Sequence, residues 1–171
     1  MVTTLIAMLT LGSAPSAEQV ISDAQARAAK AGKNVLVRFT ASWCPWCRRF
    51  DKLLADPTLG PRFAESYEIV PVTVRERGEL KKNENPGWEN VMLRYRGAVE
   101  QDVPYLVILS PKGEKLGDSY RGPEAKIPGN AGYPQKPEEI EGFLSLIRRT
   151  GKAFSAEDRV ALKRYFTPGA S

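Results

Sequence analysis

The sequence predicts a single α/β domain, because short apolar runs of strand length alternate with segments of helical pattern. With 171 residues, the chain is long enough to bury one hydrophobic core and too short for two average domains. The clearest strands are the apolar runs Asn34–Thr40 and Tyr105–Leu109. The first run leads through a short loop into a helix, the connection expected in an α/β fold.

The first residues form a mostly apolar segment without charge. Residues 2–11 precede small residues over 12–17, a pattern typical of a signal peptide with cleavage after Ala14 or Ser16. The run is too short to span a bilayer. However, no Lys or Arg precedes it, and its composition also suits a first β-strand. We expect residues 1–17 to be the signal peptide of a periplasmic or secreted protein, with an N-terminal strand of a cytoplasmic protein as the alternative.

Helices are predicted from caps and stops. Ser16 and Gln19 have capping-box spacing, and Gly32 is a typical stop for the alanine-rich helix that follows. Pro45 suits the first turn of the next helix, where its missing N–H costs nothing. The expected helices span residues 16–32, 45–55, 63–66, 88–95, 137–150 and 155–166.

The remaining segments are assigned to strands and loops. Pro71 places the strand Glu68–Glu76 at a sheet edge or a bulge, because proline cannot donate to a central ladder. A turn over 110–113 leads from the buried strand into a last strand. Residues 78–87 and 122–137 are rich in turn-forming residues, so we expect irregular loops there.

The composition excludes several kinds of site. Histidine is absent, so Ser-His-Asp and Cys-His catalysis, His-ligated haem and zinc sites built on imidazole are not available to this chain. Two cysteines are too few for a four-thiolate zinc or iron–sulfur site. We expect no metal and no organic cofactor. The net charge of +5 is too diffuse to indicate nucleic-acid binding.

The segment that most clearly indicates a reactive site is Cys44-Pro45-Trp46-Cys47. A C-x-x-C at the start of a helix brings two thiols of one turn close enough to form a disulfide. Cys44 at the helix cap faces unpaired backbone N–H groups and the positive end of the helix dipole, which favour its thiolate. We expect Cys47 to be more sheltered. Cys44 would then attack a partner disulfide as the nucleophile, and Cys47 would resolve the mixed disulfide.

Three structural roles for the cysteines compete with this interpretation: half of a zinc site, two inert core cysteines, or a fixed disulfide. Further zinc ligands are missing, and Trp43 and Pro45 place the pair at a loop–helix boundary rather than in a core. Closing so short a loop would add little stability. A redox-active pair is therefore favoured.

Two segments carry a family resemblance. Phe39–Arg48 (FTASWCPWCR) resembles the active-site segment of thioredoxin-like proteins, and Asp102–Ile108 (DVPYLVI) resembles their cis-proline segment, in the same order along the chain. The resemblance covers about residues 33–149. It implies a thioredoxin-like α/β fold, with a central mixed β-sheet flanked by helices and here an extra C-terminal helix. We divide the chain into residues 1–17, a thioredoxin-like domain over 18–150 and a C-terminal helical extension over 151–171.

The resemblance also implies roles for single residues. Pro104 would be cis and lie beside the cysteine pair, and the backbone of Val103 would hydrogen-bond an extended substrate segment. The apolar contact surface for the substrate would consist of Trp43, Trp46 and Gly122. Trp46 has a structural alternative as a partly buried packing aromatic, and we expect Trp88 and the region of Tyr95 to pack the core.

Arg38 departs from the family pattern. Thioredoxins usually have a buried acidic residue at this position, six residues before the first cysteine, where it helps to deprotonate the second. A cation cannot take up that proton. Our hypothesis is that Arg38 stabilises thiolate at the pair and makes the couple more oxidising. The alternative is that its charged head reaches solvent along its apolar stem.

The leading hypothesis for function is an enzyme, a thiol–disulfide oxidoreductase acting on protein thiols and disulfides with an unidentified donor or acceptor protein. Its direction stays open, because couples of this fold range from about −270 to about −120 mV. The alternative is a binding module that holds partners beside Pro104 and whose cysteines are structural or regulatory. Residues 148–171 have a net charge of +4. For this tail we favour a solvated helical face over contact with anionic lipid.

Overall fold

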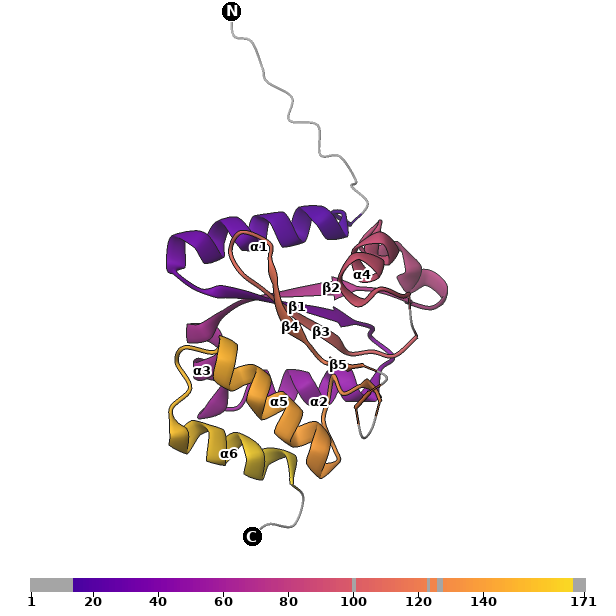
Figure 1. The fold of residues 1–171 in the computed structure, drawn as a ribbon. Helices are drawn as coiled ribbons and strands as arrows, with labels where there is room; N and C mark the ends of the chain where they lie inside the picture. Colours follow the sequence, from indigo (N-terminus) through magenta and orange to yellow (C-terminus); the bar gives the residue numbers. More distant parts are fainter. Residues whose placement is uncertain (1–13, 100, 123, 126–127, 168–171) are drawn as a thin grey trace, which may run out of the picture.

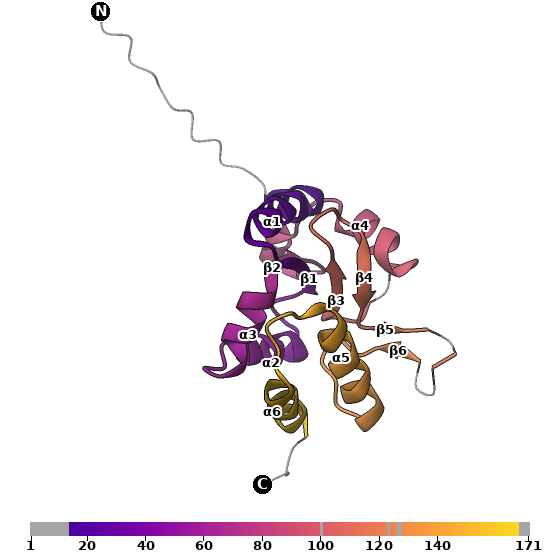
Figure 2. The same ribbon diagram turned by 60° about the vertical axis from the view of Figure 1, so that its left-hand side comes forward.

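A four-stranded mixed sheet lies at the centre of the structure, a computed structural model that describes residues 14–99, 101–122, 124–125 and 128–167. Its strand order is β2-β1-β3-β4 (Figure 1). The strands are β1 (Asn34–Thr40), β2 (Tyr67–Thr73), β3 (Tyr105–Leu109) and β4 (Lys115–Asp118). A separate small hairpin consists of β5 (Tyr120–Arg121) and β6 (Gly129–Asn130). In Figure 2 it extends away from the sheet beside α5.

Helices cover both faces of the sheet. They are α1 (Ala17–Ala31), α2 (Pro45–Leu54), α3 (Leu59–Ser66), α4 (Trp88–Arg96), α5 (Pro137–Thr150) and α6 (Ala156–Phe166), with a short 3-10 helix over Gly78–Asn83. Figure 1 shows α1 and α4 on one side of the sheet and α2, α3, α5 and α6 on the other. Within the described part of the chain, every helix is too short or too polar to cross a membrane.

The central strand β1 determines the register of the sheet. It pairs in parallel with β2, from Asn34 opposite Tyr67 to Thr40 opposite Thr73. On its other side it pairs antiparallel with β3, and Phe39 lies opposite Tyr105. The carboxyl end of β1 therefore lies beside the amino end of β3. The predicted edge position of the second strand is confirmed, because β2 is the outer strand and its Pro71 is exposed.

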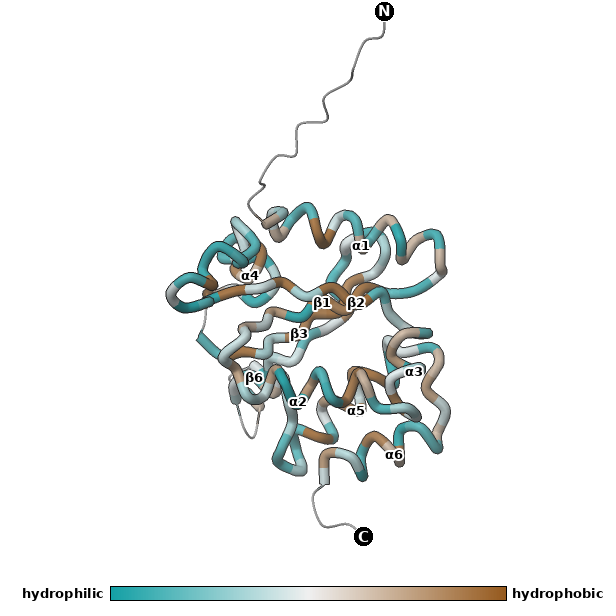
Figure 3. The backbone as a smooth tube through the Cα atoms, turned by 180° about the vertical axis from the view of Figure 1, so that it is seen from behind, coloured by the Kyte–Doolittle hydropathy of each residue, from teal (hydrophilic) through white to brown (hydrophobic). Residues whose placement is uncertain are grey.

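Alternation along β1 separates two hydrophobic cores. Val35, Val37 and Phe39 face the core formed with α1 and α4. Leu36 faces the other core, which α2, α3, α5 and α6 complete. In Figure 3 the most hydrophobic part of the chain is the centre of the sheet, with hydrophilic residues on the outer turns of the helices. By the same alternation, Arg38 lies on the face that α2 covers.

The predicted helix caps are confirmed at both ends of the chain. The Ser16 side chain accepts a hydrogen bond from the backbone N–H of Gln19 at 3.2 Å, and Gly32 ends α1 in the left-handed conformation at φ 66°. Ser155 and Asp158 form a reciprocal capping box at the start of α6.

The structure differs from the sequence prediction in the following helix, strand and loop assignments. The short helix expected over 63–66 begins at Leu59, because the Asp56 carboxylate accepts the backbone N–H groups of Thr58 and Leu59 and so starts a new helix at the predicted break. The strand expected over 68–76 runs from Tyr67 to Thr73. The segment 122–137, predicted to be irregular, contains β6. The N-terminal segment predicted as a signal peptide or strand lies almost wholly outside the described residues.

The C-terminal helix α6 is part of the second core. Leu162 is fully buried, and Phe166 packs edge-to-face on Phe143 of α5 with ring centroids 5.3 Å apart. Both belong to the cluster that contains Leu36 of β1. The last helix therefore covers core that the sheet and α5 would otherwise expose.

We expect Leu162→Ala to lower the free energy of unfolding by about 2–5 kcal/mol, because it removes buried methyl groups and leaves a cavity. The matched control is Val160→Ala in the same helix, where the side chain is 57% exposed and the expected change is within about 0.5 kcal/mol. Urea denaturation of both variants measures the difference. Equal effects would contradict the role of α6 in the core.

Candidate functional site

The cysteine pair lies at the start of α2, four residues after the carboxyl end of β1. Cys44 and Cys47 form a disulfide with their Cα atoms 5.3 Å apart. Cys44 is the N-cap residue, and the backbone N–H of Cys47 donates to its Sγ at 3.0 Å. Pro45 occupies the first turn of the helix, as predicted. The first sulfur therefore accepts one of the free N–H groups at the helix end, a contact that would stabilise a thiolate.

Both sulfurs are covered. Cys44 and Cys47 are each only 1% exposed, so the expectation that Cys47 is the more sheltered of the two is not met. The cover consists of the partly buried side chains of Trp43, Trp46 and Val103, which pack against the pair. A partner can reach Cys44 only if part of this cover moves.

Pro104 lies against the disulfide. The Val103–Pro104 peptide bond is cis, and the carbonyl oxygen of Val103 lies 3.3 Å from Cys44 Sγ. That oxygen is within reach of a thiol donor once the disulfide is reduced. The pairing of β1 with β3 brings these segments together, because Pro104 immediately precedes the residue opposite Phe39.

The loop after β6 supports Pro104 from the other side. The Asn130 side-chain amide donates to the carbonyl oxygen of Pro104 at 2.8 Å. Gly132 lies so close to the same carbonyl that a Cβ atom would collide with it. Together with Trp46 and Tyr133, these residues line a groove of about 240 Å³ next to the disulfide.

The two tryptophans are held differently. The Trp43 indole N–H donates to the backbone carbonyl of Arg75 at 2.7 Å, which fixes its ring beside Cys44. Trp46 stacks on Tyr133, with ring centroids 5.7 Å apart and planes 27° from parallel. Trp46 thus packs on a neighbouring ring, as the structural alternative expects, and it also lines the groove beside Pro104.

Glu76 is a site residue that sequence reasoning missed. Its buried carboxylate accepts the backbone N–H of Ser42 at 2.7 Å and the Ser42 hydroxyl at 2.6 Å. It therefore fixes the loop between β1 and the disulfide. Glu76 lies 34 residues from Ser42 along the chain, and only the parallel pairing of β1 with β2 brings the two together.

Arg38 lies under α2. Arg38 is only 8% exposed, and its guanidinium forms an ion pair with the Asp51 carboxylate at 2.5 Å. Asp51 is one helical turn after Cys47. Burial lowers the pKa of the Arg38 guanidinium, and the Asp51 carboxylate partly offsets this shift. The head therefore ends against a carboxylate of the helix that holds the disulfide, and not in open solvent.

The residues that the structure describes include no group of three or more Cys, Asp and Glu side chains placed to hold a metal ion.

A family model described as thioredoxin-like matches residues 16–111, more than half of the chain. The chain belongs to the thioredoxin-like family. A comparison with curated proteins found no match.

Solved structures with a thioredoxin-like fold are similar to this chain. A disulphide isomerase from Xylella fastidiosa Temecula1 is 22% identical with a TM-score of 0.49, over 67% of this chain and 80% of its own. A protein described as DsbH oxidoreductase is 17% identical with a TM-score of 0.47, over 86% of this chain and 95% of its own. A thioredoxin from Thermus thermophilus is 20% identical with a TM-score of 0.44, over 80% and 87%. The sheet and its flanking helices are those of a thioredoxin-like fold.

Gly122 is not part of this thioredoxin-like site. It is exposed just after β5, and the glycine beside Pro104 is Gly132. The reason is the β5–β6 hairpin, which carries the chain away after β4 and returns it to Pro104 only at Asn130. The sequence motif around Pro104 gave no indication of this hairpin.

We expect Gly132→Ala to lower the free energy of unfolding by about 1–3 kcal/mol, because the new Cβ collides with the Pro104 carbonyl and the backbone must shift. The matched control is Gly142→Ala in α5, where nothing lies within 4 Å of the new atom. Alanine should stabilise that helix by about 0.5–1 kcal/mol. Thermal unfolding of both variants gives the comparison, and opposite signs are expected. A neutral Gly132→Ala would contradict the close packing at Pro104.

Proposed function

We propose that this thioredoxin-like chain is a thiol–disulfide oxidoreductase for protein substrates, with Cys44 as nucleophile and Cys47 as resolving thiol. The observation that carries the proposal is the Cys44–Cys47 disulfide, capping α2 beside the cis Pro104. In this proposal the redox partner is another protein, which supplies or accepts the two electrons.

The exchange proceeds in two steps. In the reducing direction, the Cys44 thiolate attacks one sulfur of a partner disulfide, and the other partner sulfur leaves as a thiolate. The Cys47 thiolate then attacks the Cys44 sulfur of the mixed disulfide and releases the second partner thiolate. Two electrons pass from this chain to the partner, and the Cys44–Cys47 disulfide forms again. Oxidation of a partner dithiol is the reverse sequence.

The surroundings of the disulfide suit these steps. The Cys47 N–H at 3.0 Å and the start of α2 stabilise negative charge on Cys44 Sγ. The groove lined by Trp46, Pro104 and Tyr133 offers these rings to the partner segment, beside polar groups such as the Asn130 side chain. In this proposal the backbone of Val103 holds that segment in an extended form.

We also infer that the protein works outside the cytoplasm, because residues 2–17 have the pattern of a signal peptide core and cleavage region. Disulfide chemistry suits such a compartment. Expression of the full chain followed by fractionation and mass measurement tests this inference. An uncleaved protein in the cytoplasm would contradict it.

One observation favours a second candidate, a binding module with a structural or regulatory cysteine pair. Each cysteine is only 1% exposed, so the disulfide offers little surface to an attacking thiolate. A module of this kind would bind its partners through the groove whether or not the disulfide is reduced.

The two candidates differ in what the cysteine variants do. For an oxidoreductase, we expect Cys44→Ser to abolish insulin reduction with dithiothreitol as the donor, because the attacking sulfur is gone. Cys47→Ser should also stop turnover while mixed disulfides with insulin accumulate, since no thiol resolves them. Mass spectrometry of alkylated samples identifies these adducts. A wild-type rate no faster than dithiothreitol alone would support the binding module instead.

The direction of catalysis depends on the reduction potential of the pair, and in our hypothesis Arg38 affects this potential. A cation below α2 stabilises thiolate in the reduced form, which makes the couple more oxidising. The Asp51 carboxylate opposes this effect, since it neutralises the guanidinium.

We therefore expect Arg38→Met to lower the reduction potential and Asp51→Asn to raise it. A shift on the order of 30 mV corresponds to about 1.4 kcal/mol for this two-electron couple. Methionine keeps most of the apolar volume of the arginine stem, and Asp51 is half exposed, so both variants are expected to fold. Equilibration in glutathione buffers with alkylation of the thiols measures the potentials. Unchanged values for both variants would refute a role for Arg38 in the couple.

A further inference from the structure

Three exposed arginines surround the cover of the disulfide. The Arg49 guanidinium carbon lies 4.4 Å from the ring centroid of Trp46, and that of Arg77 lies 4.4 Å from the ring of Trp43. Arg48 donates to the backbone carbonyl of Ser42 at 2.8 Å. We call Arg48, Arg49 and Arg77 the arginine rim.

The arginine rim lies on both flanks of the reacting pair. Trp43 and Trp46 both pack against the cysteines, so Arg77 and Arg49 are each separated from the disulfide by a single ring. Stacking on an aromatic ring holds a guanidinium in place while its N–H groups stay free for other partners. The cations are therefore positioned at the site and still exposed.

Nearby carboxylates do not neutralise this charge. Glu76 is buried and accepts its hydrogen bonds from Ser42, and Asp51 is paired with Arg38. Asp102 lies 3.6 Å from the buried Arg96. No member of the arginine rim forms an ion pair with any residue that the structure describes. Asp102 also lines the groove beside Pro104, so the positive surface is the part over Trp43 and Trp46, where the arginine rim is available to an anion.

We propose that the arginine rim selects protein partners whose cysteine-bearing segment is acidic. Carboxylates flanking the partner's cysteine would pair with Arg49 and Arg77 as the segment enters the groove beside Pro104, and guanidinium groups bind carboxylates in a two-pronged geometry. Charge complementarity of this kind mainly accelerates association, by 10- to 1000-fold in favourable cases, and the gain falls with salt. This inference rests on the proposed oxidoreductase function and names its substrate class.

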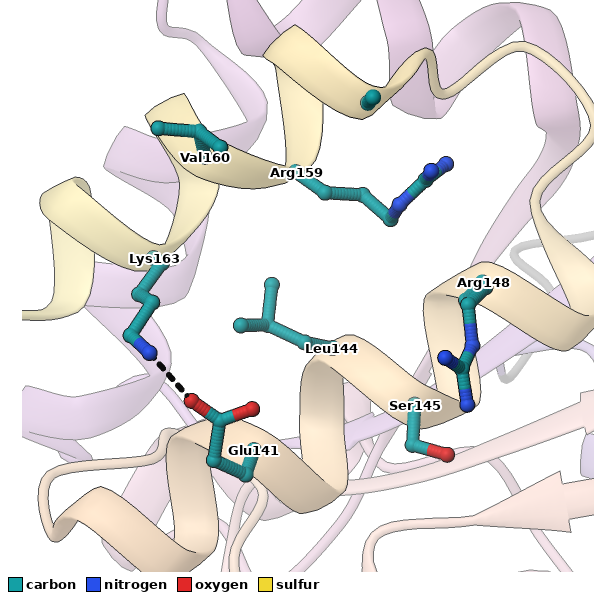
Figure 4. A pocket seen from close by; sticks show the side chains of 8 residues that line it. Glu141, Leu144, Ser145, Arg148, Arg159, Val160 and Lys163 are labelled. Carbon is teal, nitrogen blue, oxygen red and sulfur yellow. Dashed lines mark hydrogen bonds and ion pairs between the residues drawn. The ribbon is translucent and has the colours of Figure 1, made fainter.

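A second basic surface provides a control. A groove of about 340 Å³ lies between α5 and α6. Figure 4 shows Leu144 in it, between Arg148, Arg159 and Lys163. Lys163 is paired with Glu141, and Arg159 donates to the carbonyl of Phe154. This surface contributes no residue to the cysteine cluster, so removing its charge tests net charge alone.

The test uses two synthetic peptides of equal length, each with one internal disulfide, flanked in one peptide by Asp and Glu and in the other by Asn and Gln. The second-order rate constant for reduction of each peptide by the reduced protein is measured at low salt and at high salt. We expect the acidic peptide to react about tenfold faster at low salt, with most of this preference lost at high salt.

Variants assign the preference to the arginine rim. The double variant Arg49→Gln with Arg77→Gln should bring the ratio of the two rate constants close to one. Arg148→Gln with Lys163→Gln removes two positive charges from the groove between α5 and α6 and should keep the preference. The double variant Arg49→Lys with Arg77→Lys retains the charge and should keep most of the preference, so that its loss in the glutamine variant is assigned to the removal of charge.

The outcomes separate the two proposals. Equal rate constants for both peptides with the wild-type protein would overturn selection of acidic partners and leave the oxidoreductase proposal standing. The same loss in the control variant on α5 and α6 would also overturn it, because net charge would then be sufficient. Failure both to reduce either peptide disulfide and to oxidise either peptide dithiol would refute the oxidoreductase function and this inference with it.

Discussion

The antiparallel pairing of β1 with β3 is the constraint on which the site depends. β1 ends at Thr40 and leads directly to Cys44, while β3 begins immediately after Pro104. Because Phe39 lies opposite Tyr105, the disulfide and the cis-proline segment meet at the same end of the two inner strands. A slip by one residue would turn the side chains of β3 to the wrong face and move Pro104 away from the sulfurs. The chemistry is thus positioned by a fully buried strand rather than by the loops alone.

The parallel strand β2 supplies the second support, through the residues that follow it. Val74 continues the pairing beyond β2 by donating to the carbonyl of Thr40 at 2.9 Å. Arg75 and Glu76 then receive the Trp43 indole N–H and the Ser42 donors. Ser42 and Trp43, in the loop between β1 and Cys44, are thereby hydrogen-bonded to the segment that follows β2. Such support from neighbouring elements holds a site in its working geometry.

Local rules were sufficient for most of the fold, and they failed where distant segments meet. Caps such as Ser16 and Ser155, and Pro71 at the edge, act within a few residues, so the sequence alone predicts them. The disulfide at the start of α2 is predicted for the same reason. Three features depend on contacts between elements. They are the hydrogen bonds from Ser42 to Glu76, the ion pair of Arg38 with Asp51, and the position of Gly132, rather than Gly122, beside Pro104. No periodicity or spacing in one sequence contains that information. The cover over both sulfurs also arises only when Val103 packs against the tryptophans.

The position of Pro71 has a consequence for how this protein avoids binding to itself. A protein that holds extended chains risks accepting them along any free sheet edge, where unpaired backbone groups can template a further strand. β2 is such an edge, and the proline removes a backbone donor in its middle. The opposite edge is β4, a strand of only four residues that begins with a charged lysine. Both edges are thus poor templates for the addition of a further strand, and this limits aggregation of the protein through its sheet.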